Sequence, residues 1–176
     1  VRPRASVTAE LAKRLAAWIG DGPHPAPAQV PLLDADERGE CVRVENGEFV
    51  LGGKRWFAHG INFWPLYTSG MEPLGYFSHW LHPDYYIPEL IDMDLATLES
   101  LGVNLVSIQY GKTEEAPQLR DFVTRCGRHG IKVNLFISDA HPIYPAGDDD
   151  LSKRNYLELM RAANLEGNPH LFAYDL

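Results

Sequence analysis

The chain has 176 residues, of which 45% are hydrophobic, and it carries a formal net charge of −8. This length fits one domain, or one domain with an appendage. The acidic balance and the lack of a basic run disfavour a nucleic-acid partner, and no apolar run reaches membrane-spanning length. No apolar stretch follows Arg2 and Arg4, so no signal peptide is visible. A processed N-terminus would look the same, so secreted and cytoplasmic locations both stay open.

Residues 1–39 have the pattern of an appendage. Leu11, Leu15, Trp18 and Ile19 share one helical face, which predicts a short amphipathic helix over residues 8–19. The following segment, 22–31, is rich in proline and is typical of an extended linker. We therefore expect an N-terminal helix and Pro-rich linker over residues 1–39, and the main domain over residues 40–176.

The main domain begins with the pattern of a β-hairpin. Asn46-Gly47 stands between alternating apolar residues, which is a strong hairpin signal, and Gly52-Gly53 predicts a second turn. Residues 57–63 are then expected to form the first buried strand of the main fold.

Beyond residue 87 the pattern alternates between helices and strands. Pro88 suits the first turn of a helix, and glycines at 102 and 130 end helices directly before apolar strands. The strands are continuous apolar runs, which favours an α/β fold with a parallel sheet covered by helices. No glycine-rich phosphate loop follows the first strand, so a dinucleotide cofactor is not expected. The expected helices are 88–101, 117–128 and 148–164, and the expected strands are 103–109, 131–137 and 171–175.

These segments together resemble the opening of the clan A glycoside hydrolases, the cellulase and mannanase type of TIM barrel. The resemblance covers about residues 40–176 and is carried by segments 49–65, 94–106, 130–133 and 168–176. It implies a partial (β/α)8 barrel with about strands 1–4, and with the hairpin at the bottom of the barrel.

The resemblance also implies a mechanism. Family members cleave β-linked O-glycosidic bonds with retention, using two glutamates whose carboxyl groups lie about 5–5.5 Å apart. The acid/base is expected a few residues beyond Leu176, and the nucleophile much later. The chain itself is therefore expected to hold no catalytic residue, no metal and no cofactor.

Polar residues near the ends of the first three strands are candidates for binding a sugar, because neutral hydroxyls need both donors and acceptors. In TIM barrels the chemistry gathers at the carboxyl ends of the strands. The candidates are His59, Asn62, Gln109, Tyr110, Asp139 and His141. The alternative for His59 is a packed core histidine, and the alternative for Asn62 is a cap at the end of the strand. For Asp139 and His141 the alternative is a loop anchored by the aspartate.

The connection from residue 64 to 86 is long and rich in aromatic residues. Flat rings can pack against the C–H face of a sugar, and we expect Trp64 and Trp80 to do so. The alternative is a hydrophobic cluster that orders the loop. His79 and His82 lack a third ligand, so a metal site is not expected.

The main hypothesis is thus the amino-terminal half of a glycoside hydrolase acting on an oligo- or polysaccharide. One alternative is a non-catalytic half-barrel that binds carbohydrate or a partner. A further alternative keeps catalysis in this chain, with Asp139 beside Asp84 or Glu72. The first and last strands would present open edges, so we expect aggregation, self-association or pairing with a missing C-terminal barrel half.

Overall fold

The computed structural model describes residues 31–33, 38–70, 80–137 and 149–175, with backbone alone at 69–70 and 149–155. The predicted helix at 8–19 and most of the predicted linker lie outside these ranges. A small antiparallel sheet contains β1 (Arg43–Glu45), β2 (Glu48–Leu51) and β3 (Lys54–Arg55). A parallel sheet contains β4 (Gly60–Asn62), β5 (Leu105–Tyr110), β6 (Lys132–Ile137) and β7 (Leu171–Asp175). The helices are η1 (Leu66–Gly70), α2 (Pro88–Ser100), η2 (Thr113–Glu115), α3 (Ala116–Arg128) and α4 (Asp149–Ala163).

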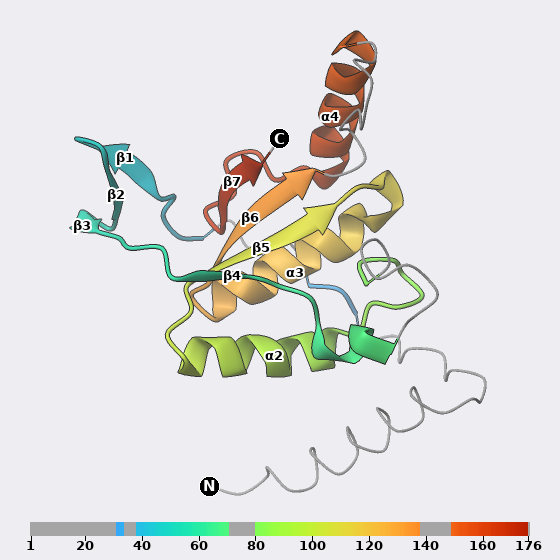
Figure 1. Ribbon diagram of the computed structural model, residues 1–176, viewed down its shortest axis with the longest axis horizontal. Helices are drawn as coiled ribbons and strands as arrows, with labels where there is room; N and C mark the ends of the chain where they lie inside the picture. The colour runs from blue at the N-terminus through green and yellow to red at the C-terminus, as the bar shows by residue number, and fades with distance from the viewer. Residues whose placement is uncertain (1–30, 34–37, 71–79, 138–148, 176) are drawn as a thin grey trace, which may run out of the picture.

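The hairpin prediction is confirmed. Asn46 and Gly47 both have positive φ, at 52° and 82°, as a two-residue type I′ turn requires. Gly52 and Gly53 make the second turn in the same way, with φ of 60° and 71°. The antiparallel sheet that results lies at the amino-terminal end of the parallel sheet (Figure 1).

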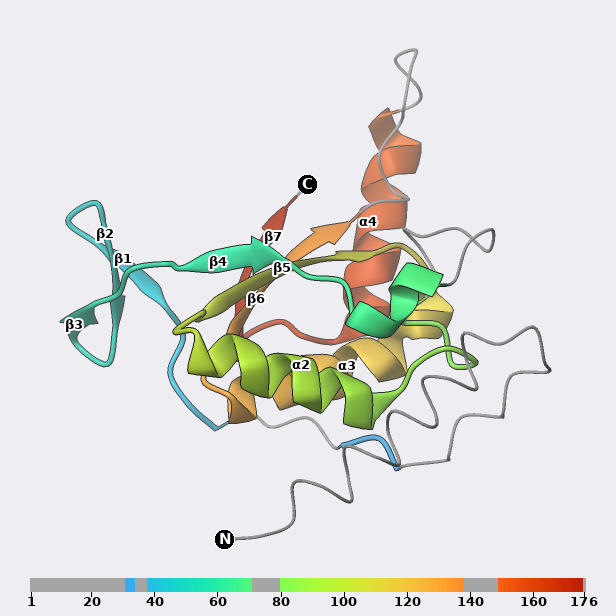
Figure 2. The same cartoon turned by 60° about the horizontal axis from the view of Figure 1, so that its bottom comes forward.

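The parallel sheet has four strands in the order β4-β5-β6-β7, so each strand lies beside the next one along the chain. Helices α2 and α3 lie side by side under one face of this sheet (Figure 2), and α3 also contacts α4. The predicted α/β class with alternating strands and helices is confirmed. The ends of α2 and α3 are set as expected, because Gly102 and Gly130 have positive φ just after them.

The core lies between the sheet and the helices. Alternate residues of β5, at Val106, Ile108 and Tyr110, are buried toward the helix side. Leu119 and Phe122 of α3 are fully buried against this layer. The other residues of β5 therefore point away from the helices, onto the opposite face of the sheet.

The first strand differs from its prediction. Only Gly60–Asn62 forms β4, and all three residues are exposed rather than buried. The stretch before it is tied by the Asn104 side chain, whose Nδ2 donates to the Phe57 carbonyl at 2.8 Å. β4 pairs with β5 alone among the described strands, and this one-sided pairing leaves it open to solvent.

Residues on both sides of the expected 39/40 boundary contact the parallel-sheet unit. The Leu33 N–H donates to Asp121 Oδ1 at 2.6 Å, on α3. Lys132 Nζ donates to the Glu40 carbonyl at 2.9 Å and to the Pro169 carbonyl at 2.7 Å. The segment that enters the main domain is therefore attached to α3 and to the amino ends of β6 and β7.

Cys126 lies in α3, and its side chain is fully buried. Burial raises the pKa of its thiol well above the ordinary value, and the Asp92 carboxylate adds to the increase. A raised pKa in the folded state means that the thiol contributes stability below the unfolded-state pKa. That contribution is lost as the pH rises toward the folded-state pKa.

We expect the free energy of unfolding to fall above pH ~8.5, where an unfolded thiol titrates. The Cys126 contribution falls by about 1.4 kcal/mol per pH unit. Lys132 acts in the opposite direction, because burial lowers its pKa. The difference between wild type and Cys126→Ala in urea titrations from pH 7 to 10 isolates the thiol. A difference that stays constant over this range would contradict the assignment.

Candidate functional site

The sheet face turned away from the helices carries a group of polar side chains together with Leu105, Phe136 and Ala173. Ser107 and Gln109 alternate along β5 with the buried residues of the core and are half-buried. On β6, Asn134 and Phe136 alternate in the same way with Val133, Leu135 and Ile137, which are buried toward the helices. This face therefore collects the side chains that the core excludes.

Strand register brings these side chains into rows. Asn62 pairs with Ser107, and Ser107 pairs with Asn134, so the three lie on adjacent strands at one level. Asn134 Nδ2 donates to Ser107 Oγ at 3.1 Å. Gln109 and Asp175 belong to the next row, on either side of Phe136. We call the set Asn62, Ser107, Gln109, Asn134 and Asp175 the polar face.

The chemistry of the polar face suits a neutral hydroxylated ligand. The carboxamides of Asn62 and Asn134 flank the Ser107 hydroxyl, and the Gln109 carboxamide lies in the next row. Together these groups offer several hydrogen-bond donors and acceptors. Asp175 is the one ionisable residue in this set, whereas general acid/base catalysis at a sugar needs a pair of carboxyls. No group of His, Cys, Asp and Glu suited to a metal ion occurs in the part of the chain that the structure describes. The face can bind and orient a ligand but does not supply a catalytic pair.

Lys132 lies at the amino end of β6, on the same side as Asn134 by strand alternation. Its ammonium group is bound to two backbone carbonyls and its side chain is buried. Burial lowers its pKa, which the nearby Cys41 and Glu40 partly offset. Lys132 therefore holds the entering segment in place and adds no free cation to the polar face.

An aromatic cluster connects the antiparallel sheet to β7. The Phe172 ring lies 5.1 Å from Phe49 and 5.4 Å from Trp56, measured between ring centroids. Phe172 occupies the register shift between β6 and β7, which lets its side chain reach the hairpin. These rings fix the hairpin against the amino-terminal part of β7.

Of the predicted binding residues, the structure brings Asn62 and Gln109 onto the polar face. His59 lies elsewhere: it precedes β4, and its Nδ1 is 3.0 Å from the Gly102 carbonyl, in the loop that leads into β5. Its predicted position at the carboxyl end of the first strand is wrong. His59 instead anchors the amino end of that strand.

Tyr110 lies on the helix side of β5 and is fully buried. Its hydroxyl donates to the Leu159 carbonyl at 3.3 Å, and burial raises its pKa to about 12. Tyr110 ends β5 as expected, but strand alternation turns its side chain to the helix side, away from Gln109. Its predicted role in binding a sugar stays a prediction. The structure gives Tyr110 a packing role between the sheet and α4.

Trp80 is also part of the core, with 3% of its surface exposed. Its ring packs edge-on against Phe63 and Phe122 and stacks on Tyr86. The alternative of an ordering hydrophobic cluster therefore describes the packing of Trp80, and its stacking on a sugar stays a prediction. Trp64 is half-buried just after β4, against the same core.

Asp139 and His141 lie outside the described residues, as does Glu72. Their predicted roles stay predictions. Asp84 is described, with 78% of its side chain exposed, and its Oδ2 lies 3.6 Å from His82 Nδ1.

Ser107, Asn134 and Asp175 were not among the predicted binding residues. Strand alternation could have found two of them, since Ser107 is two residues before Gln109. Asn134 is the one uncharged polar residue in the apolar run 131–137, and this also marks a side chain that leaves the core. Predicting the place of Asp175 would have required the register of β7 against β6, which residue type does not reveal.

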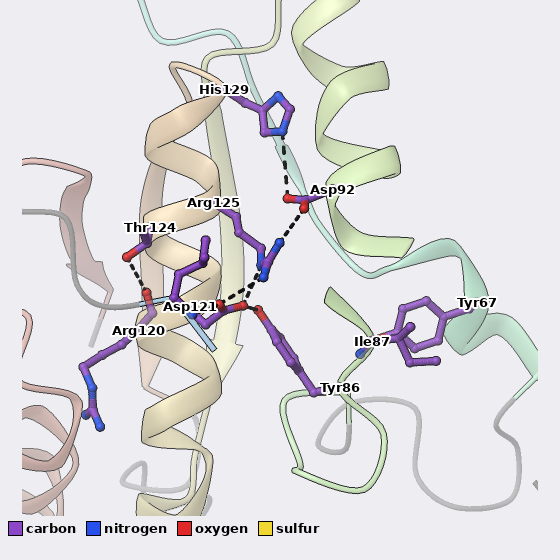
Figure 3. Close-up of polar contacts among 10 residues, drawn as sticks. Tyr67, Tyr86, Ile87, Asp92, Arg120, Asp121, Thr124, Arg125 and His129 are labelled. Atoms are coloured by element: carbon purple, nitrogen blue, oxygen red, sulfur yellow. Dashed lines mark hydrogen bonds and ion pairs between the residues drawn. The ribbon is translucent and has the colours of Figure 1, made fainter. Parts of the chain in front are cut away.

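A second polar cluster lies between α2 and α3 (Figure 3). The Asp121 carboxylate is fully buried and accepts hydrogen bonds from Tyr86 Oη at 2.5 Å and from Arg125 Nε at 2.6 Å. Arg125 also binds Asp92 on α2. Burial and the Asp121 charge raise the pKa of Tyr86, so its hydroxyl stays a donor. These groups saturate one another, so the cluster joins the helices and offers no ligand site.

No family model, curated protein or solved structure matches this chain. In the described residues, no helix combines the length and apolar character needed to cross a membrane.

Proposed function

We propose that the polar face is one wall of a carbohydrate-binding cleft, and that the chain is the amino-terminal half of a (β/α)8 barrel of the cellulase and mannanase type. Three features support the proposal. The four parallel strands follow chain order, helices separate them along the chain, and a hairpin lies at their amino-terminal end. Strand order of this kind is how such a barrel begins.

The single observation that carries the proposal is the row Asn62, Ser107 and Asn134, with Gln109 one level further along. In a closed barrel, side chains on this face point inward, and those nearest the carboxyl ends of the strands line the site. Asn62 and Gln109 lie at or next to the carboxyl ends of β4 and β5, and their carboxamides can bind sugar hydroxyls without carrying charge.

On this proposal the chain binds and orients the sugar, and the cleavage step uses residues outside it. The reaction is hydrolysis of a β-linked O-glycosidic bond with retention, and the two catalytic glutamates are expected beyond Leu176. One carboxyl is the general acid/base and the other is the nucleophile. The isolated chain is therefore expected to bind β-linked oligosaccharides without cleaving them.

The test is calorimetric titration with cello- and manno-oligosaccharides. We expect Gln109→Ala to weaken binding about tenfold, since a lost hydrogen bond with its desolvation cost amounts to about 1–3 kcal/mol. Tyr110→Phe is the matched control, because it removes a hydroxyl from the neighbouring residue on the opposite face. Equal affinity of wild type and Gln109→Ala, or no binding to either sugar series, would contradict the proposal.

A non-catalytic binding module is the other outcome of the same experiment. Sugar binding that persists with no hydrolysis after the other half of the barrel is supplied would favour it. In that case the polar face is still the binding site, but the proposed hydrolase activity is excluded.

A further inference from the structure

The segment that follows β4 is held at two points by groups at α2. Leu66, the first residue of η1, donates its N–H to Asp94 Oδ2 at 2.8 Å. The N–H of Ile87, just before α2, donates to the Tyr67 hydroxyl at 3.3 Å. Asp94 thereby caps η1, because the first N–H groups of a helix find no acceptor within it. The position of η1 is therefore set by α2 and the residue before it.

Trp64 lies between this anchor and the end of β4. Before it, the Phe63 N–H donates to the Ser107 carbonyl at 2.9 Å, which continues the pairing of β4 with β5. After it, Pro65 is buried, and its carbonyl accepts hydrogen bonds from the N–H and the hydroxyl of Thr68 at 2.9 and 2.7 Å. Trp64 itself packs against the core and stays partly exposed. Its place is therefore set by backbone that is fixed on both sides.

The location of Trp64 connects this anchor to the polar face. Trp64 comes two residues after Asn62, at the carboxyl end of β4, where the chemistry of TIM barrels gathers. An indole ring in that place suits the C–H face of a sugar whose hydroxyls bind the polar face. Leu66 leaves 70% of its surface exposed, so the outer side of this segment is open.

We propose that Asp94 is a positioning residue of the carbohydrate site, whose carboxylate fixes the backbone at Leu66 and so holds Trp64 against a bound sugar. This inference rests on the proposed function and adds to it the residue that sets the aromatic side of the cleft. Asp94 itself contacts no sugar in this arrangement. It acts through the backbone of Leu66 and the ring of Trp64.

The electrostatics of Asp94 agree with a role in the site rather than in the fold. Burial raises the pKa of its carboxyl, and the Leu66 N–H offsets part of the increase. The contribution of this carboxyl to stability is therefore present at low pH and is lost as the pH rises through the folded-state pKa. The hydrogen bond to Leu66 is exposed, so water can replace the carboxylate there. We therefore expect Asp94→Ala to stay folded at neutral pH, with a nearly unchanged midpoint of urea unfolding.

The test is a double-mutant cycle in sugar affinity, measured by calorimetric titration with cello- and manno-oligosaccharides. We expect Asp94→Ala to weaken binding about fivefold, the effect of one lost hydrogen bond. Trp64→Ala should weaken it at least as much. In the Trp64→Ala background, Asp94→Ala should have almost no further effect, because both changes remove the same contact. A full additional loss in the double variant would mean that Asp94 does not act through Trp64, and would overturn the proposal.

The indole N–H signal of Trp64 in an NMR spectrum gives a second readout that needs no sugar. We expect this signal to move in Asp94→Ala and to return toward its wild-type position in Asp94→Asn, which keeps a side-chain oxygen as acceptor. The same Asn variant should recover most of the sugar affinity. A Trp64 signal that stays in place in Asp94→Ala would show that the carboxylate does not position the ring.

Glu99→Ala is the matched control for the loss of an acidic side chain from α2. Glu99 binds His129 Nδ1 at 2.7 Å, just beyond α3, and its removal is expected to leave sugar affinity unchanged. Equal losses for Glu99→Ala and Asp94→Ala would indicate a general charge effect and overturn the positioning role. Wild-type affinity in Asp94→Ala would do the same but keep the proposed function. A wild-type chain that binds no sugar overturns the proposed function, and the positioning role with it.

Discussion

Asp121→Asn is expected to lower the free energy of unfolding by about 3–5 kcal/mol, because it leaves a buried guanidinium without its buried counter-charge. Asp121 is fully buried and accepts hydrogen bonds from Arg125, Tyr86 and the Leu33 N–H. An amide retains one acceptor but presents an NH2 group to these donors. Urea unfolding followed by circular dichroism measures the loss.

Asp92→Asn is the matched control, since it changes the other carboxylate that binds Arg125. The Asp92 side chain is 43% exposed, so solvent screens its charge. We expect this variant to lose about 1 kcal/mol or less. Equal losses for the two variants would show that the buried carboxylate does not hold the cluster together.

Phe122→Ala is expected to cost about 3–5 kcal/mol, the range for removing a buried aromatic side chain. Phe122 has no exposed surface, stacks on Phe63 at 5.4 Å and meets Trp80 edge-on at 5.0 Å between ring centroids. Phe63 directly follows β4, so this contact also fixes the end of the strand that presents Asn62. The variant should therefore lose sugar affinity together with stability.

Phe57→Ala serves as the control for Phe122→Ala. Phe57 is 78% exposed, and its removal should change the free energy of unfolding by no more than about 0.5 kcal/mol. Thermal unfolding of the three proteins at one pH compares them directly. A similar small change for Phe122→Ala would mean that the end of β4 is held by other contacts.

The local elements were predictable because their signals are local. Asn46-Gly47 has the backbone freedom of a type I′ turn, and Pro88 begins a helix for which its missing N–H costs nothing. Gly102 and Gly130 end helices in the left-handed conformation. Each of these turns and helix ends depends on a few neighbouring residues, so the sequence alone is sufficient to predict them.

The candidate site was only half predictable because it depends on alternation and register. Gln109 and Tyr110 are adjacent in sequence, but they lie on opposite faces of β5. Trp80 comes from an aromatic-rich segment, and only its packing against Phe63, Tyr86 and Phe122 shows that it is core. His59 was placed at the wrong end of its strand, because β4 begins one residue after it.

The most direct measurement is an amide NMR titration of the chain with a β-linked oligosaccharide. The proposed cleft predicts that the largest shifts fall on Asn62, Ser107, Gln109 and Asn134, the neighbours across the polar sheet face. Signals from the cluster around Asp121, between α2 and α3, should stay where they are. Shifts that gather on the helix side, or an unchanged spectrum at millimolar sugar, would contradict a carbohydrate site on this sheet.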